Sequence, residues 1–286
     1  MLCDSIAADA YLRKEYHGFS VTQEKIRAAQ KFALAPDFAL AADGLTDNYA
    51  ELERIAPFCR LPYRLCWFEF AQADRAHWRA APLHYPGLQS SPLRVGFLAE
   101  ALRDDLACWR ATLFWSLNNP VHHSLNASPM VTIYDTAKSM GAEKLASLVD
   151  FDFAEFDCGI PDSIAAEYYG KLARSDWAGE VRYLFAVLGL LNARNVAEAE
   201  TVSYERLNRS RAKAKKPPLS THTLLKIRSV HRRSLTGKGS GATAETRAHF
   251  VRGHFKTRKT GIFFWRPYMR GDLAHGYAAK DYEVRR

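Results

Sequence analysis

The sequence lacks the features that mark several classes of protein. No apolar run reaches the length of about 18 residues that crosses a bilayer as a helix, so neither a transmembrane helix nor a membrane partner is expected. Residues 1–16 lack the basic start and apolar centre of a signal peptide. The five cysteines include no C-x-x-C pair, which excludes a common zinc-site spacing and gives no sign of a disulfide framework. These absences predict a protein of a reducing, cytosolic compartment.

Nucleotide-binding and cofactor motifs are also missing. The glycine-rich segment at residues 237–241 lacks the G-x-x-x-x-G-K-[ST] order of a phosphate-binding loop. His249 and His254 lie five residues apart, which is not a usual spacing for metal ligands, and Asp272 is the single acid near them. Glu69 lies inside an apolar strand without a second carboxylate beside it, which favours a structural role over a catalytic one. We therefore expect no metal and no cofactor.

Charge is distributed very unevenly along the chain. Of its 40 Lys and Arg and 31 Asp and Glu, 21 and 5 fall in residues 201–286, which leaves 19 and 26 for residues 1–200. The C-terminal part is therefore suited to a polyanion, and the rest of the chain is not. A basic surface kept only for solubility is the alternative.

Hydrophobic periodicity predicts an α+β fold. Four segments have the composition of strands and suggest an antiparallel meander flanked by helices: residues 64–71, 93–102 with a bulge suggested at Gly96, 108–117 and 130–134. Residues 4–33 and 45–55 are predicted to be helical, and residues 177–195 form the strongest helical pattern. Residues 151–158 are predicted to be an edge strand or a loop, and residues 223–230 a strand. The predicted domains are residues 1–175 and a basic C-terminal domain of residues 176–286.

The C-terminal domain is expected to be a small, basic antiparallel β-sheet. Apolar and polar residues alternate through residues 249–252 and 255–257, the period of a half-buried strand. Gly261 interrupts this pattern before a second strand at residues 262–265, and a third is predicted at residues 277–284.

Cations and aromatic residues interleave along this sheet, which is typical of surfaces that bind phosphates and stack on unpaired bases. A second basic run, residues 206–219, is either an arm that orders on RNA or a flexible linker. The predicted nucleic-acid-binding residues are Arg206, Asn208, Arg209, Arg211, Lys213, Lys215, Lys216, Arg247, Arg252, Lys256, Arg258, Trp265, Arg266, Arg270 and Lys280.

Several C-terminal motifs resemble those of a widespread phage and prophage protein family. They are N-x-x-R at residues 208–211, H-x-x-R-G-H-F at 249–255, F-W-x-P-x-x-R-G at 264–271 and K-x-Y at 280–282. The resemblance covers roughly residues 204–284. It is weaker upstream, where it includes Leu-Pro-Tyr at 61–63, W-x-E-F at 67–70 and R-V-G-F-L at 94–98.

The resemblance implies a regulator. The best described member of the family is a type V-A anti-CRISPR protein that acts against a host defence: it recognises the emerging N-terminal peptide of its target and causes loss of the mRNA being translated. The shared block would then contact RNA or the ribosome, and the N-terminal part would select a nascent peptide.

A metal-independent endoribonuclease is the alternative function. One imidazole of His249 and His254 would accept the 2′-hydroxyl proton, the other would protonate the leaving oxygen, and Arg252 would stabilise the phosphorane. On one continuous strand the two histidines face opposite sides, so a bulge at Gly253 would be needed. A DNA-binding regulator is a third hypothesis, disfavoured because no helix-turn-helix is recognisable.

Overall fold

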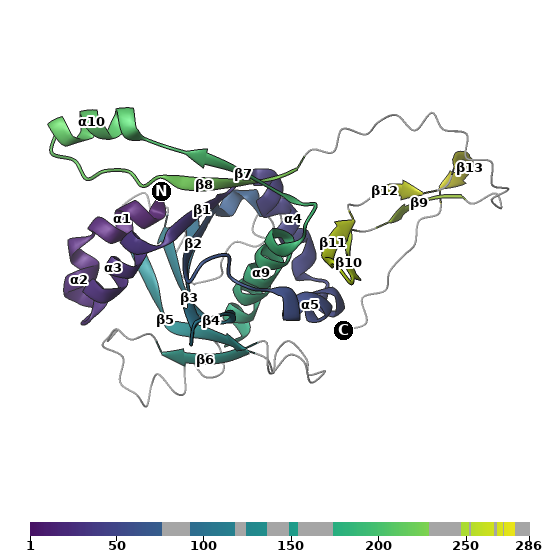
Figure 1. Ribbon diagram of the computed structural model, residues 1–286, viewed down its shortest axis with the longest axis horizontal. Helices are drawn as coiled ribbons and strands as arrows, with labels where there is room; N and C mark the ends of the chain where they lie inside the picture. The colour runs from purple at the N-terminus through teal and green to yellow at the C-terminus, as the bar shows by residue number, and fades with distance from the viewer. Residues whose placement is uncertain are drawn as a thin grey trace, which may run out of the picture.

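The computed structural model describes residues 1–75, 92–117, 124–135, 149–153, 174–228, 247–251, 253–265, 268–270 and 272–277. One eight-stranded sheet with helices against both faces forms its centre, and the C-terminal strands lie to one side (Figure 1). The fold is therefore α+β, as the sequence predicts. Within the described residues no helix is both long and apolar enough to cross a membrane.

The large sheet has the strand order β6-β5-β4-β3-β2-β1-β8-β7. Strands β2 to β5 each pair antiparallel with the next one along the chain, ending with β6, which confirms the predicted meander. Strand β6 is the edge strand expected in that region, shifted slightly upstream. The bounds are β1 Gln30–Leu34, β2 Leu65–Ala71, β3 Pro92–Leu102, β4 Asp105–Leu117, β5 Ser124–Asp135, β6 Val149–Phe153, β7 Ala197–Val202 and β8 His222–Ile227.

Strand β1 was not predicted. The sequence suggested that the helical region runs to residue 33, but helix α3 ends at Ala28 and Gln30–Leu34 forms a strand. This strand pairs parallel with β2 on one side and with β8 on the other. A central parallel strand is buried on both faces and so loses the alternation that marks a half-exposed strand. The neighbouring strands, and not local propensity, therefore decide its conformation.

The helices cover the two faces of the sheet. Helices α1 Leu2–Ala8, α2 Ala10–Glu15 and α3 Phe19–Ala28 pack over Trp67, Leu98 and Phe114. Helices α4 Pro36–Thr46, α5 Tyr49–Ile55 and α9 Arg174–Asn192, with the short helix η1 Ala56–Phe58, share one core with the opposite face. Because side chains alternate along a strand, β2 sends Trp67 to the first face and Phe68 and Phe70 to the second.

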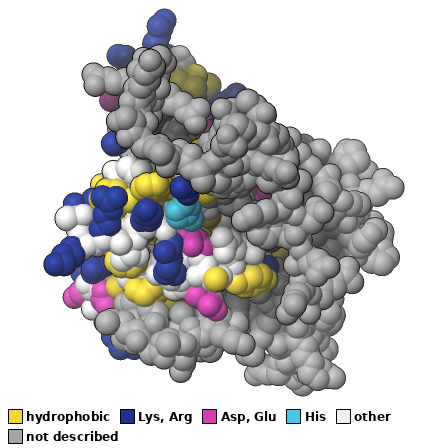
Figure 2. Space-filling view, turned by 90° about the vertical axis from the view of Figure 1, so that its right-hand side faces the viewer, with side chains coloured by type: hydrophobic (Ala, Val, Ile, Leu, Met, Phe, Trp, Pro, Cys, Tyr) yellow, Lys and Arg dark blue, Asp and Glu magenta, His cyan; other side chains and the backbone are white. Residues whose placement is uncertain are grey.

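The C-terminal strands form two sheets and not one. Strands β10 His254–Arg258 and β11 Gly261–Trp265 make an antiparallel hairpin. Strands β12 Tyr268–Arg270, β9 Arg247–Val251 and β13 Asp272–Tyr277 make a three-stranded sheet in which β13 runs parallel to β9. The prediction of a single antiparallel sheet is therefore wrong in the number of sheets. The chain leaves strand conformation at Gly253, which divides the predicted first strand in two. Figure 2 shows the side of the molecule that lies to the right in Figure 1.

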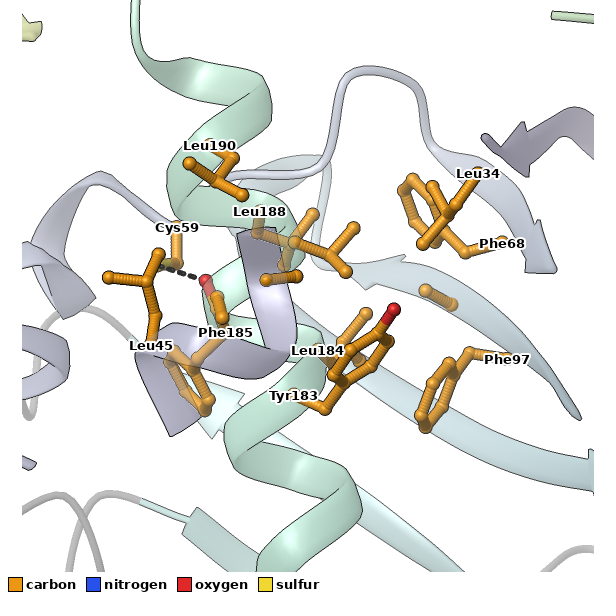
Figure 3. Packing of buried hydrophobic residues seen from close by; sticks show 14 of the residues in the cluster. Leu34, Leu45, Cys59, Phe68, Phe97, Tyr183, Leu184, Phe185, Leu188 and Leu190 are labelled. Carbon is orange, nitrogen blue, oxygen red and sulfur yellow. Dashed lines mark hydrogen bonds between the residues drawn. The ribbon is translucent and has the colours of Figure 1, made fainter. Parts of the chain in front are cut away.

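Helix α9 fills the centre of the core and confirms the strongest helical prediction. Every residue from Tyr183 to Leu190 is buried, so the helix is enclosed on nearly all sides and not along a single stripe. Its side chains meet residues of α4, β1, β2 and β3, and the Cys59 thiol donates to the Phe185 carbonyl oxygen at 3.5 Å (Figure 3).

The proposed division of the chain at residues 175 and 176 stays a prediction about units that fold independently. Among the described residues, α9, β7 and β8 lie on the C-terminal side of that division, yet they share the large sheet or its core with the N-terminal elements.

Gly96 makes room for an aromatic ring. The bulge suggested there is absent, because Gly96 stays in register between Glu69 and Phe114. A Cβ atom at Gly96 would lie 2.2 Å from Cζ2 of the buried Trp67 ring, a separation that no side chain can adopt. The glycine is therefore a packing requirement.

Replacing Gly96 by alanine is expected to lower the free energy of unfolding by about 1–3 kcal/mol, because the Trp67 ring must shift in a filled core. The matched control is Gly44→Ala in helix α4, where an added Cβ has no atom within 4 Å. That change should raise stability by about 0.5–1 kcal/mol through helix propensity. Urea unfolding of both variants measures the two effects, and equal changes in the two variants would contradict this packing.

Candidate nucleic-acid interface

The β10–β11 hairpin is anchored to the molecule by one apolar side. Phe255, Ile262 and Phe264 are 0%, 2% and 6% exposed and belong to the same core as α5 and α9. Burial alternates along β11, whereas on β10 Phe255 is the buried residue and the strand is exposed from Lys256 onward. Because side chains alternate along a strand, the residues next to these anchors point the other way. The sequence predicted strands in both places.

Polar contacts to the hairpin backbone fix its orientation on the helices. Phe255 donates its N–H to the Glu51 carboxylate and accepts from the Arg54 guanidinium, both on α5. After α9, Asn195 accepts from the Phe264 N–H at 3.0 Å and donates to the Phe264 carbonyl oxygen at 2.9 Å. The backbone N–H of Arg194 donates to Ile262 at 3.2 Å. Both strands are thus held by a partner from the large core.

The opposite side of the hairpin carries cations and rings. His254 lies opposite Trp265 across the strands, and Lys256 lies opposite Phe263. Arg258 follows on the same side of β10. We call these five residues the hairpin face. Lys256 and Arg258 are exposed, and Trp265 is 38% exposed although it is a large apolar side chain.

Cation–π contacts organise the hairpin face. The Lys256 ammonium lies 3.9 Å from the centre of the Trp265 ring, and the Arg258 guanidinium lies 5.5 Å from the centre of Phe263. Each contact is worth about 0.5–1 kcal/mol at an exposed site. Each ring therefore has a cation close to it, a combination suited to stacking on a base and neutralising a phosphate.

More cations surround the hairpin face. Arg194 lies against Gly261, whose φ of +126° is a conformation that L side chains rarely adopt. Lys259 in the turn and Arg54 on α5 are exposed. Figure 2 shows Lys and Arg side chains gathered on this side of the molecule, interspersed with hydrophobic residues and a smaller acidic area.

The second basic run lies elsewhere. It forms helix α10 Glu205–Lys213 and the turn after it, at the tip of the β7–β8 ribbon, at the end of the molecule away from the hairpin (Figure 1). Among the described residues, the cations of this run therefore lie apart from those of the hairpin face. Arg206, Arg209, Lys213, Lys215 and Lys216 are exposed there.

Two residues predicted to contact nucleic acid have structural bonds at the tip of the ribbon. The Asn208 side chain exchanges two hydrogen bonds with the backbone of Leu219, at 2.9 and 2.8 Å. Arg211 donates through Nε to the Pro217 carbonyl oxygen at 2.8 Å. These bonds fold the following segment back along the helix.

Two further predicted binding residues lie in the three-stranded sheet. Arg247 lies on β9, and the exposed Arg270 lies on β12 opposite His249. Arg252, Arg266 and Lys280 lie outside the described residues, as do most of the third predicted strand and the glycine-rich segment.

The structure does not bring the two candidate catalytic histidines onto one strand. His249 belongs to β9 in the three-stranded sheet, and His254 belongs to β10 in the hairpin. Strand β9 and strand β10 pair with different strands. Gly253 therefore separates two strands and does not form a bulge that would place both histidines on one face of a single strand.

Glu69 has the structural role favoured from sequence. Its carboxylate is fully buried and accepts hydrogen bonds from the backbone of Leu2 at 2.8 Å, Trp67 Nε1 at 3.0 Å and Arg94 Nε at 2.6 Å. It thereby ties α1 to β2 and β3. Within the part of the chain that is described, no group of His, Cys, Asp and Glu has the arrangement of a metal site.

A second buried ionic cluster also binds elements together. Arg75 donates to Asp43 at 2.9 Å and to both Glu180 oxygens at 2.8 Å, and its guanidinium lies 4.3 Å from the centre of the Tyr183 ring. Burial raises the pKa of Tyr183 well above its ordinary value. The cluster joins α4 and α9.

Sequence reasoning missed several parts of the interface. Phe263 and Lys259 stood inside the recognised pattern but were not selected, although alternation places Phe263 on the hairpin face. Arg194 and Asn195 gave no signal, because their partners on β11 lie far away in the sequence.

Comparison of the chain with protein-family models, curated proteins and solved structures found no match. The resemblance to the phage family therefore stays an expectation carried by the C-terminal motifs.

Asn195→Ala should loosen the hairpin selectively. It removes two hydrogen bonds to Phe264, each worth about 0.5–1.5 kcal/mol, so the free energy of local opening should fall by about 1–3 kcal/mol. Hydrogen exchange at the Phe264 amide measures this opening. The control is Asn192→Ala at the end of α9, which removes side-chain hydrogen bonds to the carbonyl oxygens of Arg60 and Leu188. Equal exchange at Phe264 in both variants would contradict the anchoring role.

Proposed function

We propose that the chain is an RNA-binding regulator that contacts unpaired RNA through the hairpin face. The observation that carries the proposal is the placement of Lys256 and Arg258 over the rings of Trp265 and Phe263, on the outward side of a hairpin whose other side is buried. Exposed rings beside cations suit single-stranded nucleic acid, because every base has a face that stacks and every nucleotide has a phosphate.

The geometry supports a simple order of events on binding. A base that stacks on Trp265 displaces the Lys256 ammonium, which lies 3.9 Å from the ring centre. The displaced ammonium then reaches the phosphate of the same or the next nucleotide. The hairpin itself need not move, since Phe255 and Phe264 hold it to the core. Little ordering is therefore required of the protein, which favours affinity.

The wider role rests on the resemblance to the phage and prophage family. We include in the proposal that the chain acts in the cytoplasm of a bacterial host, on a transcript during translation or on the ribosome. There it would lower expression of a host defence protein, and its N-terminal part would contact a nascent peptide. The net charge of the chain, +9, is compatible with a polyanionic partner.

RNA cleavage is not part of the proposal, because His249 and His254 lie on strands of different sheets. Purified protein incubated with RNA in EDTA should leave the RNA intact, as judged by gel electrophoresis. Cleavage that persists in EDTA and is abolished by both His249→Ala and His254→Ala would replace this proposal with the endoribonuclease.

The hairpin face can be tested with a single-stranded oligonucleotide such as oligo(U). Trp265→Ala removes a stacking ring and should weaken binding about tenfold or more, since a stacked base is worth about 1–3 kcal/mol. Lys256→Ala and Arg258→Ala should each make the slope of log affinity against log salt less steep by about 0.7.

Arg64→Ala is the matched control for these variants. Arg64 is an exposed cation paired with Asp104 and is not one of the hairpin-face residues, so its loss should leave both affinity and salt slope nearly unchanged. If the Trp265 variant binds oligo(U) as tightly as the Arg64 variant, the hairpin face is not the binding surface.

A further inference from the structure

The segment between β7 and β8 forms a helix that packs against no part of the described core. Strands β7 and β8 pair between residues 197–202 and 222–227, and the segment between them projects beyond the sheet (Figure 1). Helix α10 within it has 9 residues and buries none of them. An isolated helix of that length is marginal in water, so neither burial nor propensity explains why it is present.

Local bonds hold the projecting segment in a defined form. Asn208 and Arg211 bind the backbone of Leu219 and Pro217, as described above. The Ser220 N–H donates to the Asp4 carboxylate at 3.1 Å, which fixes the returning strand to α1. The helix is therefore presented to solvent in a fixed orientation, and the side chains that bind the turn lie on one side of it.

The other side of α10 carries a row of cations. Arg206, Arg209 and Lys213 are spaced i, i+3 and i+7, so they share one face of the helix, roughly opposite Asn208 and Arg211. At a rise of about 1.5 Å per residue the steps between them are about 4.5 and 6 Å along the axis. All three are exposed, and among the described residues none takes part in an ion pair that holds it to the protein.

The chemistry of this row differs from that of the hairpin face. Glu205 is the single acid between residues 204 and 219, against six Lys and Arg. Helix α10 contains no aromatic residue, and the ring of Tyr204 at its start lies 5.7 Å from that of His222. A row of cations without rings has the chemistry for contacts to phosphates but not for stacking on bases, which suits a duplex whose bases are already stacked.

We propose that the cation row on α10 binds the phosphate backbone of double-stranded RNA, as a second site separate from the hairpin face. The inference rests on the proposed function in that both sites act on one RNA. A transcript with a stem next to an unpaired segment offers both chemistries. Such a molecule engages the two surfaces together, and its affinity exceeds that for the stem or the unpaired segment alone.

The test compares three RNA ligands. The first is a blunt duplex of about 16 base pairs, which is the length that a double-stranded RNA-binding domain spans. The second is oligo(U), and the third is the same duplex with an oligo(U) tail. The triple variant R206A/R209A/K213A should weaken duplex binding at least about tenfold and make its salt slope less steep by about 2 to 3. Binding of oligo(U) should change less than about twofold. The double variant K256A/W265A should weaken binding of oligo(U) and leave binding of the duplex nearly unchanged.

A second triple variant, K14A/R64A/R228A, is the control because it removes the same charge from exposed positions on other elements. It should leave duplex binding within about twofold of the wild type. Both triple variants should unfold at the wild-type temperature. In the first, α10 buries none of its residues and alanine favours a helix. In the control, all three replaced side chains are exposed.

Several results overturn the inference. If the two triple variants lose duplex binding equally, duplex binding depends on net charge and not on the cation row. Tighter binding of a DNA duplex, or of polyglutamate, than of the RNA duplex assigns the row to another partner. Failure of the wild type to bind the duplex while oligo(U) still binds removes the second site and leaves the proposed function standing. Failure to bind oligo(U) removes the proposed function.

Discussion

The burial of Phe255, Ile262 and Phe264 against α5 and α9 is the contact on which the hairpin face depends. It turns a two-stranded hairpin, which is marginal in isolation, into a rigid part of a large core. The partners of the hairpin backbone, Glu51 and Asn195, fix which side faces outward. Cations and rings on the outward side are therefore presented without any cost of ordering the backbone.

The large sheet places the two basic surfaces apart. Strand β1 joins the N-terminal meander to β8 through parallel pairing, and β8 continues into the ribbon that carries α10. Helix α9 crosses the same core and ends at Asn192, just before Arg194 and Asn195, where the hairpin docks. One sheet thus sets the spacing between a surface with rings and a surface with cations alone.

Local patterns in the sequence were sufficient to predict the antiparallel meander, helix α9 and the strands β10 and β11. These features repeat with a period that neighbouring residues reveal. Strand β1 was missed because burial on both faces removes its period. Gly96 was misinterpreted because its reason is the ring of Trp67 on another strand. Of the predicted binding residues, Lys256, Arg258 and Trp265 meet on one face, whereas those of α10 lie at the other end of the molecule. Contacts between distant segments, such as Arg194 with Gly261, leave no local trace.

Photocrosslinking tests the central claim most directly. An oligonucleotide containing 4-thiouridine is bound to the protein and irradiated, and the attached peptide is identified by mass spectrometry. The account predicts attachment within residues 254–265, at Trp265 or its neighbours on the hairpin face. Attachment confined to α1, α2 and α3, on the opposite face of the large sheet, would contradict it.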